Sequence, residues 1–522
     1  MGIYLNPTAQ LFKIALASRI YVDKSKLIEI TNEKFGTDER FICVSRPRRF
    51  GKTTDLSMLE AYYSKNADGK SMFKDLDISK VEGYEHYLNN CNVIHINAVK
   101  VFKSGVSIQN SINKFTVKLL REIQTQINDV EFDINDDLEE ILEQIYDQTG
   151  VPFVFLVDEW DAIFREREYT IDDQRQYLKF LRNIFKDSGY IGLVYMTGIL
   201  PIKKYGDHSA INCFDEFSMT NQAIMADLTG FTEQEVQRIC QKYEMPFDEM
   251  KEWYNGYNVN GISIYNPRSV TEAVRNRECS NYWTKTETYE ALRKYIQMDI
   301  DGLKKSIIKM IAGEEIAINP TQFQNDMVTF HDADDVLTLL VHLGYLTYNA
   351  KRQTVKIPNK EIQDEFIVSV KISRWSEVMD AINTSEKLLT ATLNMDNDKI
   401  AELVEKVHED NSSVLEYNNE NTLSCVLSLA YYTAKRDYMI YRELPTGKGY
   451  ADLAFIPKYG VMKPAIIVEL KWDKSVETAL KQIEEKNYTS NIASYNGEIL
   501  LVGINYDKAS KKHACEVKKI VK

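Results

Sequence analysis

Short apolar runs alternate with longer amphipathic stretches over the first 230 residues. Four runs, at 41–44, 93–96, 153–157 and 191–197, have the composition of strands buried on both faces. A helical stretch with an acidic tail separates the second run from the third. Strands that alternate with helices predict a parallel sheet with crossover helices, and so an α/β fold for residues 1–230.

The pattern changes after residue 230. Thr232, followed three residues later by Glu235, is typical of a capped helix start, and aromatic loops follow it. We expect a helical lid over 231–300. An apolar helix then leads into a strand at about 345–348, and Arg352 stands at a turn into a second strand. Helices with a small hairpin predict a winged-helix-like connector over 301–371.

A third region, residues 372–522, begins with polar helical stretches and ends in strands. Residues 449–456 and 465–470 are predicted to be neighbouring strands with a turn at 458–460. A helix over 476–486 and a strand over 497–503 follow. The pattern predicts a second, separate α/β domain.

A candidate phosphate-binding loop follows the first strand. Residues 46–54 read RPRRFGKTT, in which Gly51, Lys52 and Thr53 match the end of the phosphate-loop pattern. Such a loop presents backbone N–H groups and a helix N-terminus to phosphates, and its lysine adds a mobile cation. Arg46 stands where the general pattern has its first glycine. A basic turn that binds nothing is the alternative for this segment.

The third apolar run ends in two acidic residues, Asp158 and Glu159. A carboxylate at the end of a buried strand is suited to hold Mg²⁺ together with the Thr53 hydroxyl, and a second one to polarise the attacking water. Thr197, at the end of the fourth run, is a candidate sensor of the terminal phosphate. A solvated loop start and a simple strand cap are the alternatives. The whole predicted nucleotide site is Arg49, Phe50, Gly51, Lys52, Thr53, Thr54, Asp158 and Thr197, with Glu159 as the catalytic base.

A second candidate site lies about 300 residues downstream. Asp452 lies on one predicted strand, and Glu469 and Lys471 lie on the next. Because side chains alternate along a strand, Glu469 and Lys471 face the same side. Two carboxylates on adjacent strands are suitable oxygen ligands for Mg²⁺, and a lysine beside them can orient water or stabilise charge. Exposed charges on an ordinary strand are the alternative.

These motifs resemble those of the bacterial AAA-ATPase-like family whose members carry a C-terminal PD-(D/E)XK nuclease domain. The matching segments are 21–24, 45–54, 157–159, 197–199, 230–232, 253–257 and 265–267. The resemblance covers nearly the whole chain, and in this family arginine replaces the first glycine of the loop. It implies an ATP-binding core, a helical lid, a winged-helix-like connector and a nuclease fold. It also implies that Glu420 is a further metal carboxylate and that Gln482 faces the nuclease site.

Amino-acid composition bears on the class of protein and on its cellular compartment. The seven cysteines are scattered and never form a CxxC pair, which argues against a disulfide framework or a structural zinc site. No apolar run is long enough for a membrane span, and the first residues lack a secretory pattern, so we expect a cytoplasmic protein. The net charge of −13 disfavours binding to nucleic acid, because contacts with phosphates need Lys and Arg side chains. Lysines are, however, frequent after residue 507.

We therefore expect an ATPase whose nucleotide state controls a Mg²⁺-dependent nuclease, with ATP and Mg²⁺ as cofactors. DNA is the first expected partner and RNA the second, and a homo-oligomer stays open. The alternative is a nucleotide-driven switch or scaffold, similar to a signalling ATPase, whose nuclease-fold domain binds nucleic acid or a partner without cutting.

Overall fold

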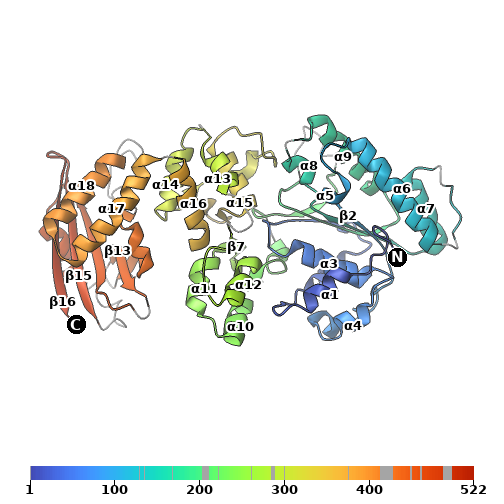
Figure 1. Ribbon diagram of the computed structural model, residues 1–522, viewed down its shortest axis with the longest axis horizontal. Coiled ribbons are helices and arrows are strands. Elements are labelled where there is room, and N and C mark those ends of the chain that lie inside the picture. The colour runs from blue at the N-terminus through green and yellow to red at the C-terminus, as the bar shows by residue number, and fades with distance from the viewer. Residues whose placement is uncertain are drawn as a thin grey trace. The chain divides into compact units, whose positions relative to one another are not determined.

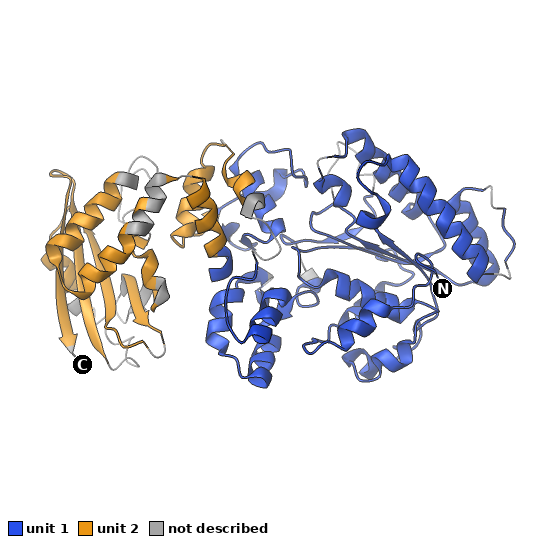
Figure 2. Cartoon of the chain, in the orientation of Figure 1, with its two compact units in different colours: residues 1–287, 317–362 blue, residues 288–316, 363–522 orange. Residues whose placement is uncertain are grey.

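A computed structural model provides the fold. The residues that it describes are 2–127, 130–133, 136–166, 168–202, 211–221, 223–259, 261–283, 289–298, 300–373, 375–411, 427–428, 430–446, 449–458, 461–485 and 497–521. The chain forms two compact units (Figure 2). Unit 1 comprises residues 1–287 and 317–362, and unit 2 comprises residues 288–316 and 363–522. The four domain boundaries inferred from the sequence stay a prediction.

A five-stranded parallel sheet organises unit 1. Its order is β2 (Asn92–Asn97), β3 (Phe153–Asp158), β4 (Ile191–Gly198), β1 (Phe41–Ser45) and β5 (Asp215–Phe217). The four strands predicted from apolar runs are confirmed, and with them the α/β class. The sequence analysis did not find β5, which is three residues long and carries two acidic residues.

Helices cover both faces of this sheet (Figure 1). On one face, α3 (Lys52–Tyr63) packs against β3 and β4, and six of its ten buried side chains join the main apolar core. Beside it lie α1 (Gln10–Leu16), α2 (Lys26–Lys34) and α4 (Gly69–Phe73). The other face carries α5 (Ala98–Val101), α6 (Ile108–Gln126), α7 (Leu138–Thr149), α8 (Ala162–Arg165) and α9 (Ile171–Phe185).

The topology brings distant segments to one edge. All five strands run parallel, so their carboxyl ends lie on the same side of the sheet. The phosphate loop follows β1, Asp158 ends β3, and Thr197 lies near the end of β4, which separates the other two. The candidate nucleotide residues therefore converge.

The lid contains three helices and a small antiparallel sheet. The helices are α10 (Glu233–Tyr243), α11 (Phe247–Tyr254) and α12 (Pro267–Asn276), and the sheet order is β6 (Phe231–Thr232), β8 (Ile262–Tyr265), β7 (Tyr257–Val259). The predicted cap is present, because the side chains of Thr232 and Glu235 each accept the other's backbone N–H. Tyr254 and Tyr257 are fully buried in packing contacts.

The predicted helix and hairpin of the connector are also present. They are α15 (Ala333–Leu343), β10 (Thr347–Asn349) and β11 (Thr354–Lys356), and β9 (Ile316–Ala317) pairs beside β11. His342 is buried in α15 and stacks on Phe323, which agrees with a core role.

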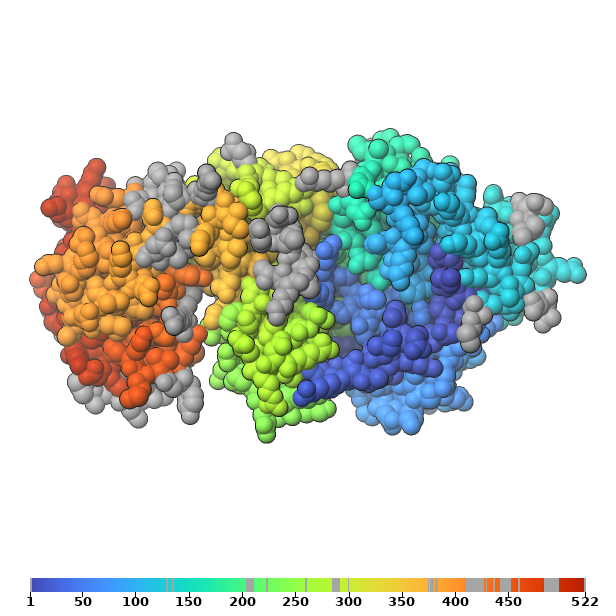
Figure 3. All heavy atoms as spheres, in the orientation of Figure 1, coloured from blue at the N-terminus to red at the C-terminus, as the bar shows by residue number. Residues whose placement is uncertain are grey.

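The N-terminal segment of unit 1 lies against the lid (Figure 3, dark blue beside yellow-green). Lys24 Nζ donates to the Asp227 carbonyl at 2.8 Å and forms an ion pair with Glu235 at 2.7 Å. Nearby, the Tyr243 hydroxyl donates to the carbonyl of Arg19 at 2.5 Å. These contacts tie residues about 200 positions apart into one structure.

Unit 2 contains a mixed five-stranded sheet in sequential order. Its strands are β12 (Tyr438–Thr446), β13 (Gly449–Pro457), β14 (Ala465–Trp472), β15 (Glu498–Asp507) and β16 (Lys512–Val521), and only β14 and β15 pair in parallel. Its helices are α13 (Tyr289–Ile296), α14 (Leu303–Ile311), most of α16 (Lys360–Ile372), α17 (Ser376–Leu393), α18 (Asn397–Asn411) and α20 (Val476–Glu485). The strands predicted at 449–456, 465–470 and 497–503 are confirmed. Among the described residues, no helix has the length and hydropathy of a membrane span.

Candidate nucleotide and nuclease sites

The phosphate loop turns from β1 into the N-terminus of α3. Gly51 makes this turn with φ +100°, a conformation that a side chain would strain, and its carbonyl accepts the N–H groups of Thr54 and Asp55. Lys52 Nζ donates to the carbonyls of Arg46 and Pro47 at 2.9 and 2.8 Å, so the lysine lies over the loop. Burial lowers the pKa of Lys52, although nearby carboxylates, foremost that of Glu159, oppose this.

Asp158 joins the ends of three strands. Its carboxylate accepts the Thr53 hydroxyl at 3.1 Å, the Thr197 hydroxyl at 2.7 Å and the Asn97 amide at 3.4 Å. Three residues that the sequence analysis selected separately are therefore in direct contact. Asn97 was not selected, although its place at the end of an apolar run carried the same signal.

Glu159 is held by an arginine. It adopts φ +55°, and its carboxylate pairs with Arg165, which also lies 3.1 Å from Asp161. Asp161 in turn accepts the N–H groups of Ile199 and Leu200 at the end of β4. Burial alone would lower the pKa of Arg165, but the two carboxylates raise it. The sequence analysis named neither Asp161 nor Arg165.

Arg46 supports the loop from inside the protein. It is 1% exposed, and its guanidinium donates to the carbonyls of Ser45, Phe217 and Met225 at 3.0 to 3.1 Å. Burial lowers its pKa to about 10. Arg46 stands where the general loop pattern has its first glycine, and its side chain ties β1 to β5 and to the segment after it.

The other unusual residues of the loop contact the lid and the connector. Arg49 Nη1 donates to the Trp283 carbonyl at 3.0 Å, and the Phe50 ring packs edge-on against Tyr257 at 5.1 Å. Pro47 lies against Gly344, at whose position a Cβ atom would stand 2.7 Å from the Pro47 Cβ. The family-specific residues of the loop thus contact Tyr257 and Trp283 of the lid and Gly344 of the connector.

The nuclease candidates lie on one face of the unit 2 sheet. Along β14, Ala465 and Ile467 pack on Leu480 of α20, and the alternation then places Glu469 and Lys471 on the same face. Lys471 Nζ lies 2.9 Å from Glu469 Oε1, and both side chains are less than a tenth exposed. Gln482 of α20 donates to the same oxygen. This agrees with the predicted orientation of Gln482.

Asp452 lies on β13, beside β14. Its carboxylate accepts the backbone N–H of Leu470 at 2.7 Å, next to Glu469 in the chain. Glu420, the further metal carboxylate that the resemblance implies, lies outside the described residues. Within the described part of the chain, no three His, Cys, Asp or Glu side chains form a metal-binding group. Asp452 and Glu469 provide carboxylate oxygens here, which are the donors that Mg²⁺ prefers.

Comparisons with known proteins find one family domain around each of the two candidate sites. A family model described as a predicted AAA-ATPase matches residues 8–206, and one described as the PD-(D/E)XK nuclease superfamily matches residues 418–516. An uncharacterized protein encoded in the vnfD 5′ region of Azotobacter chroococcum mcd 1 is 27% identical over 364 residues. The match covers 66% of this chain and 64% of that protein, so the chain spans less than two thirds of its relative's length.

Two solved structures show a distant likeness. The Walker-type ATPase PABY2304 of Pyrococcus abyssi matches with a TM-score of 0.36 and 13% identity, over 66% of this chain and 94% of its own. The Aeropyrum pernix ORC2 protein in its ADPNP–ADP complexes matches with a TM-score of 0.30 and 13% identity, over 71% and 99%. The two family matches decide the identity: the chain joins a domain of the AAA-ATPase-like family, residues 8–206, to a domain of the PD-(D/E)XK nuclease superfamily, residues 418–516.

Proposed function

We propose that this protein binds and hydrolyses ATP, and that its nucleotide state controls a Mg²⁺-dependent phosphodiesterase acting on nucleic acid in the cytoplasm. DNA is the first expected substrate, and RNA is the second. The observation that carries the proposal is the contact of Thr53 and Thr197 with Asp158, directly beside Lys52 at the start of a helix. A carboxylate with two hydroxyl groups beside a lysine is suited to bind Mg²⁺ and phosphate, whereas packing alone does not require such a group of polar side chains.

The ATP half of the proposal rests on donor chemistry. Loop N–H groups and Lys52 suit the phosphates, and the Thr53 hydroxyl with the Asp158 carboxylate offers the oxygen donors that Mg²⁺ takes. Bound Mg²⁺ would neutralise phosphate charge. Glu159 would orient the attacking water and accept its proton, which requires its carboxylate to leave Arg165. Thr197, whose hydroxyl donates to Asp158, would report on the terminal phosphate.

The nuclease half rests on Asp452, Glu469 and Lys471. The two carboxylates, with Glu420 as a third, would hold Mg²⁺, which would activate water and polarise the phosphodiester. Lys471 would stabilise charge on the phosphate once a metal draws Glu469 away from it. Gln482 would keep the Glu469 carboxylate in place.

The test uses the purified full chain. ATP hydrolysis should fall to background in Lys52→Ala, while Glu159→Gln should bind ATP but turn it over at least about 10²-fold more slowly. Cleavage of single- and double-stranded DNA and RNA, with and without ATP, should require Mg²⁺. It should disappear in Asp452→Ala and Lys471→Ala, whose ATPase persists.

Two results would change the proposal. Undiminished cutting by both nuclease variants would refute the assignment of the nuclease site. The switch or scaffold is the better description if two results coincide. No nucleic acid is cut, and the wild type binds no more divalent metal than Asp452→Ala does. Equal cutting with and without ATP would refute control by the nucleotide.

A further inference from the structure

Arg49 has an unfavourable backbone conformation that a neighbouring segment holds in place. It stands two residues before Gly51 in the phosphate loop and adopts φ +68°. A side chain in this left-handed region is strained, and such strain persists only where the surrounding structure maintains it. Arg49 Nη1 donates to the Trp283 carbonyl at 3.0 Å, and the guanidinium lies over the Trp283 ring at 5.9 Å. The shape of the loop at Arg49 therefore depends on where the Trp283 carbonyl lies.

A buried carboxylate fixes the backbone at Trp283. Glu361 is 1% exposed, and its Oε1 accepts the N–H groups of Tyr282 and Trp283 at 2.8 and 3.0 Å. Its Oε2 accepts the Ser269 hydroxyl at 2.9 Å, and its backbone carbonyl accepts the Asn281 amide at 3.3 Å. A charged group leaves water only where such donors replace it, so the position of the 281–283 backbone is tied to that of Glu361.

Glu361 lies in the first turn of α16, a helix that begins in unit 1 and continues into unit 2 from residue 363. Gln363, two residues later, donates its side-chain amide to the carbonyl of Ile311, the last residue of α14 in unit 2, at 3.0 Å. One turn of hydrogen-bonded helix thus carries both the carboxylate that holds residues 281–283 and a side chain bound to a helix of unit 2.

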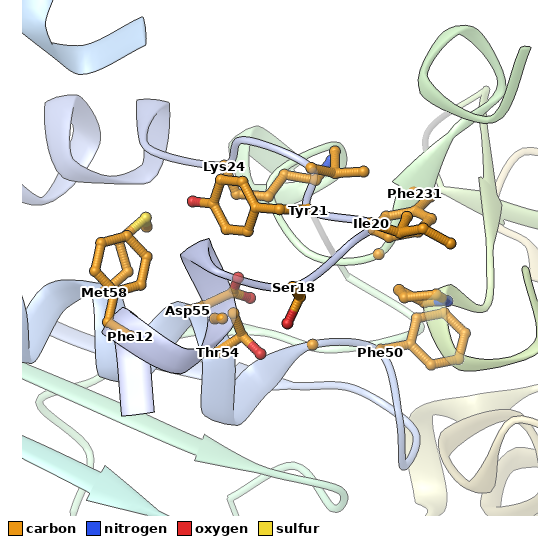
Figure 4. Close-up of a pocket in the computed structure, with 15 residues that line it drawn as sticks. Phe12, Ser18, Ile20, Tyr21, Lys24, Phe50, Thr54, Asp55, Met58 and Phe231 are labelled. Carbon is orange, nitrogen blue, oxygen red and sulfur yellow. The ribbon is translucent and has the colours of Figure 1, made fainter. Parts of the chain in front are cut away.

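The next residue of the loop is also held by the lid. Phe50 packs edge-on against Tyr257 at 5.1 Å, and it lines a pocket together with Asp55 and Phe231 (Figure 4). Gly51 follows Phe50 directly, at the turn into α3. A shift at Arg49 or Phe50 would therefore reach the residues proposed to bind the phosphates.

We propose that Glu361 is a positioning residue for the phosphate loop, and that the contacts from Arg49 through Trp283 to Glu361 couple the bound nucleotide to α16. This rests on the proposed nucleotide site and names the residues through which its state would reach unit 2. Phosphates on the loop fix the backbone at Arg49, and so favour the arrangement of residues 281–283 and Glu361 that fits it. By linkage, the arrangement at Glu361 alters the affinity for the nucleotide by the same factor.

The first measurement is hydrogen exchange of the full chain with and without ATP, in Glu159→Gln so that ATP persists. ATP should slow exchange in residues 281–283 and 360–372 by at least about 3-fold, since bound phosphates fix the contacts that hold them. Glu361→Gln should keep this response, because its amide oxygen can accept the two N–H groups and its amide N–H can donate to the Ser269 hydroxyl. Glu361→Ala should lose it.

The second measurement is a double-mutant cycle on the dissociation constant of ATP, by calorimetry. Glu361→Ala should weaken ATP binding about 10-fold in the wild-type chain, but less than about 2-fold when Arg49→Ala is already present, because the two residues act in series. Glu361→Gln should stay within about 2-fold of the wild type.

Asp326→Ala is the matched control for both measurements. Asp326 is 2% exposed and, like Glu361, accepts two backbone N–H groups and one hydroxyl, but these belong to Val328 and Thr329 of its own turn. Its removal should change the dissociation constant of ATP by less than about 2-fold and keep the exchange response.

The outcomes separate this proposal from the proposed nucleotide site. If the wild type binds no ATP, that site is wrong and the coupling falls with it. If ATP binds and Lys52→Ala abolishes binding, but ATP does not slow exchange in residues 281–283 and 360–372, only the coupling is wrong. That comparison needs no variant of Glu361, so poor folding of Glu361→Ala cannot hide the answer. Equal weakening by Glu361→Ala with and without Arg49→Ala would show that Glu361 does not act through Arg49.

Discussion

The hydroxyl of Thr53 donates to the carboxylate of Asp158 at 3.1 Å, across 105 residues of sequence. One residue opens the helix after the phosphate loop, and the other ends a strand two places away in the sheet. Thr197, on the strand between them, donates to the other oxygen of the same carboxylate at 2.7 Å. The parallel sheet thus assembles a candidate Mg²⁺–phosphate site from three separate segments.

Asp158→Asn tests this centre with little change of shape. The amide oxygen can still accept from one threonine, and the hydroxyl of the other can turn to accept from the amide N–H, so the variant should fold, but it lacks the charge that a divalent cation requires. We expect ATP turnover to fall by about 10²-fold or more, with the melting temperature close to that of the wild type. Steady-state hydrolysis and thermal unfolding measure the two effects. Full activity of Asp158→Asn would remove Asp158 from the site.

Arg165→Ala tests the support of Glu159. Arg165 is the ion-pair partner of Glu159 and of Asp161, whose side chain is fully buried. Removing it leaves a buried charge uncompensated, so the free energy of unfolding should fall by about 3 kcal/mol. Chemical denaturation measures this loss. The exposed Arg175 provides the control, because Arg175→Ala should change stability by less than about 0.5 kcal/mol. Equal effects of the two variants would show that the pair contributes nothing.

Gly344→Ala tests the contact of the connector with the phosphate loop. Gly344 has φ +86°, and an added Cβ would stand 2.7 Å from Pro47. The left-handed conformation costs about 1 kcal/mol, and the overlap adds about 1–3 kcal/mol. If the contact positions the loop, the KM for ATP should also rise. Gly83→Ala has φ +77° and open space around it, so it should cost only the conformational part and leave KM unchanged. Matching results for both variants would contradict the coupling.

Gln482→Ala tests the positioning of the nuclease carboxylate. Gln482 donates to Glu469 from α20, and outer hydrogen bonds of this kind are worth about 10- to 100-fold in metal affinity or activity. We expect cleavage to need more Mg²⁺ for half-maximal rate and to be rescued partly at high Mg²⁺. Titration of the cleavage rate with Mg²⁺ measures this. Lys474→Ala changes an exposed residue of the loop before α20 and should leave the Mg²⁺ dependence unchanged. An unchanged Mg²⁺ dependence in Gln482→Ala would remove this role.

The stability of the protein should depend on pH through Asp55. Burial raises the pKa of Asp55 to about 7, against the lowering effects of Thr229, Lys24, Arg46 and Lys52. Tyr21 and Tyr195 also lie within electrostatic reach, but both keep their protons over this range because their own pKa values are raised.

The same raised pKa makes a prediction for stability. Because folding disfavours the ionised form, the cost is absent below the unfolded pKa, near 3.8, and complete above about pH 7. Asp55→Asn should thus gain stability relative to the wild type as pH rises from 5 to 8, by an amount of the order of a few kcal/mol. A difference that does not change with pH would mean that Asp55 titrates normally.

Local pattern was sufficient for much of the fold. The runs that became β1 to β4, β13, β14 and β15 are apolar because side chains on both faces of these strands are buried, and that burial can be predicted from composition, even for β2 at the edge of its sheet. Three other edge strands, β5, β12 and β16, were missed, since they carry more polar residues and lose that signal. The predicted parallel sheet puts the carboxyl ends of these strands on one side, but the strand order that brings Thr53, Asp158 and Thr197 together came from the tertiary structure.

By itself, then, the sequence determined the α/β class, the two family domains and the motif residues, because these depend on local periodicity and on short segments. Only the tertiary structure decided which side chains meet. In the folded protein the Arg46 side chain points into the core, and Glu159 pairs with Arg165. Contacts with the lid and connector are made by Pro47, Arg49 and Phe50. The Oδ2 atom of Asp55 is buried beside a pocket. Those relations join residues up to 297 positions apart, such as Pro47 and Gly344. No short segment of the sequence predicts these contacts, since they arise from packing between elements that lie far apart in the chain.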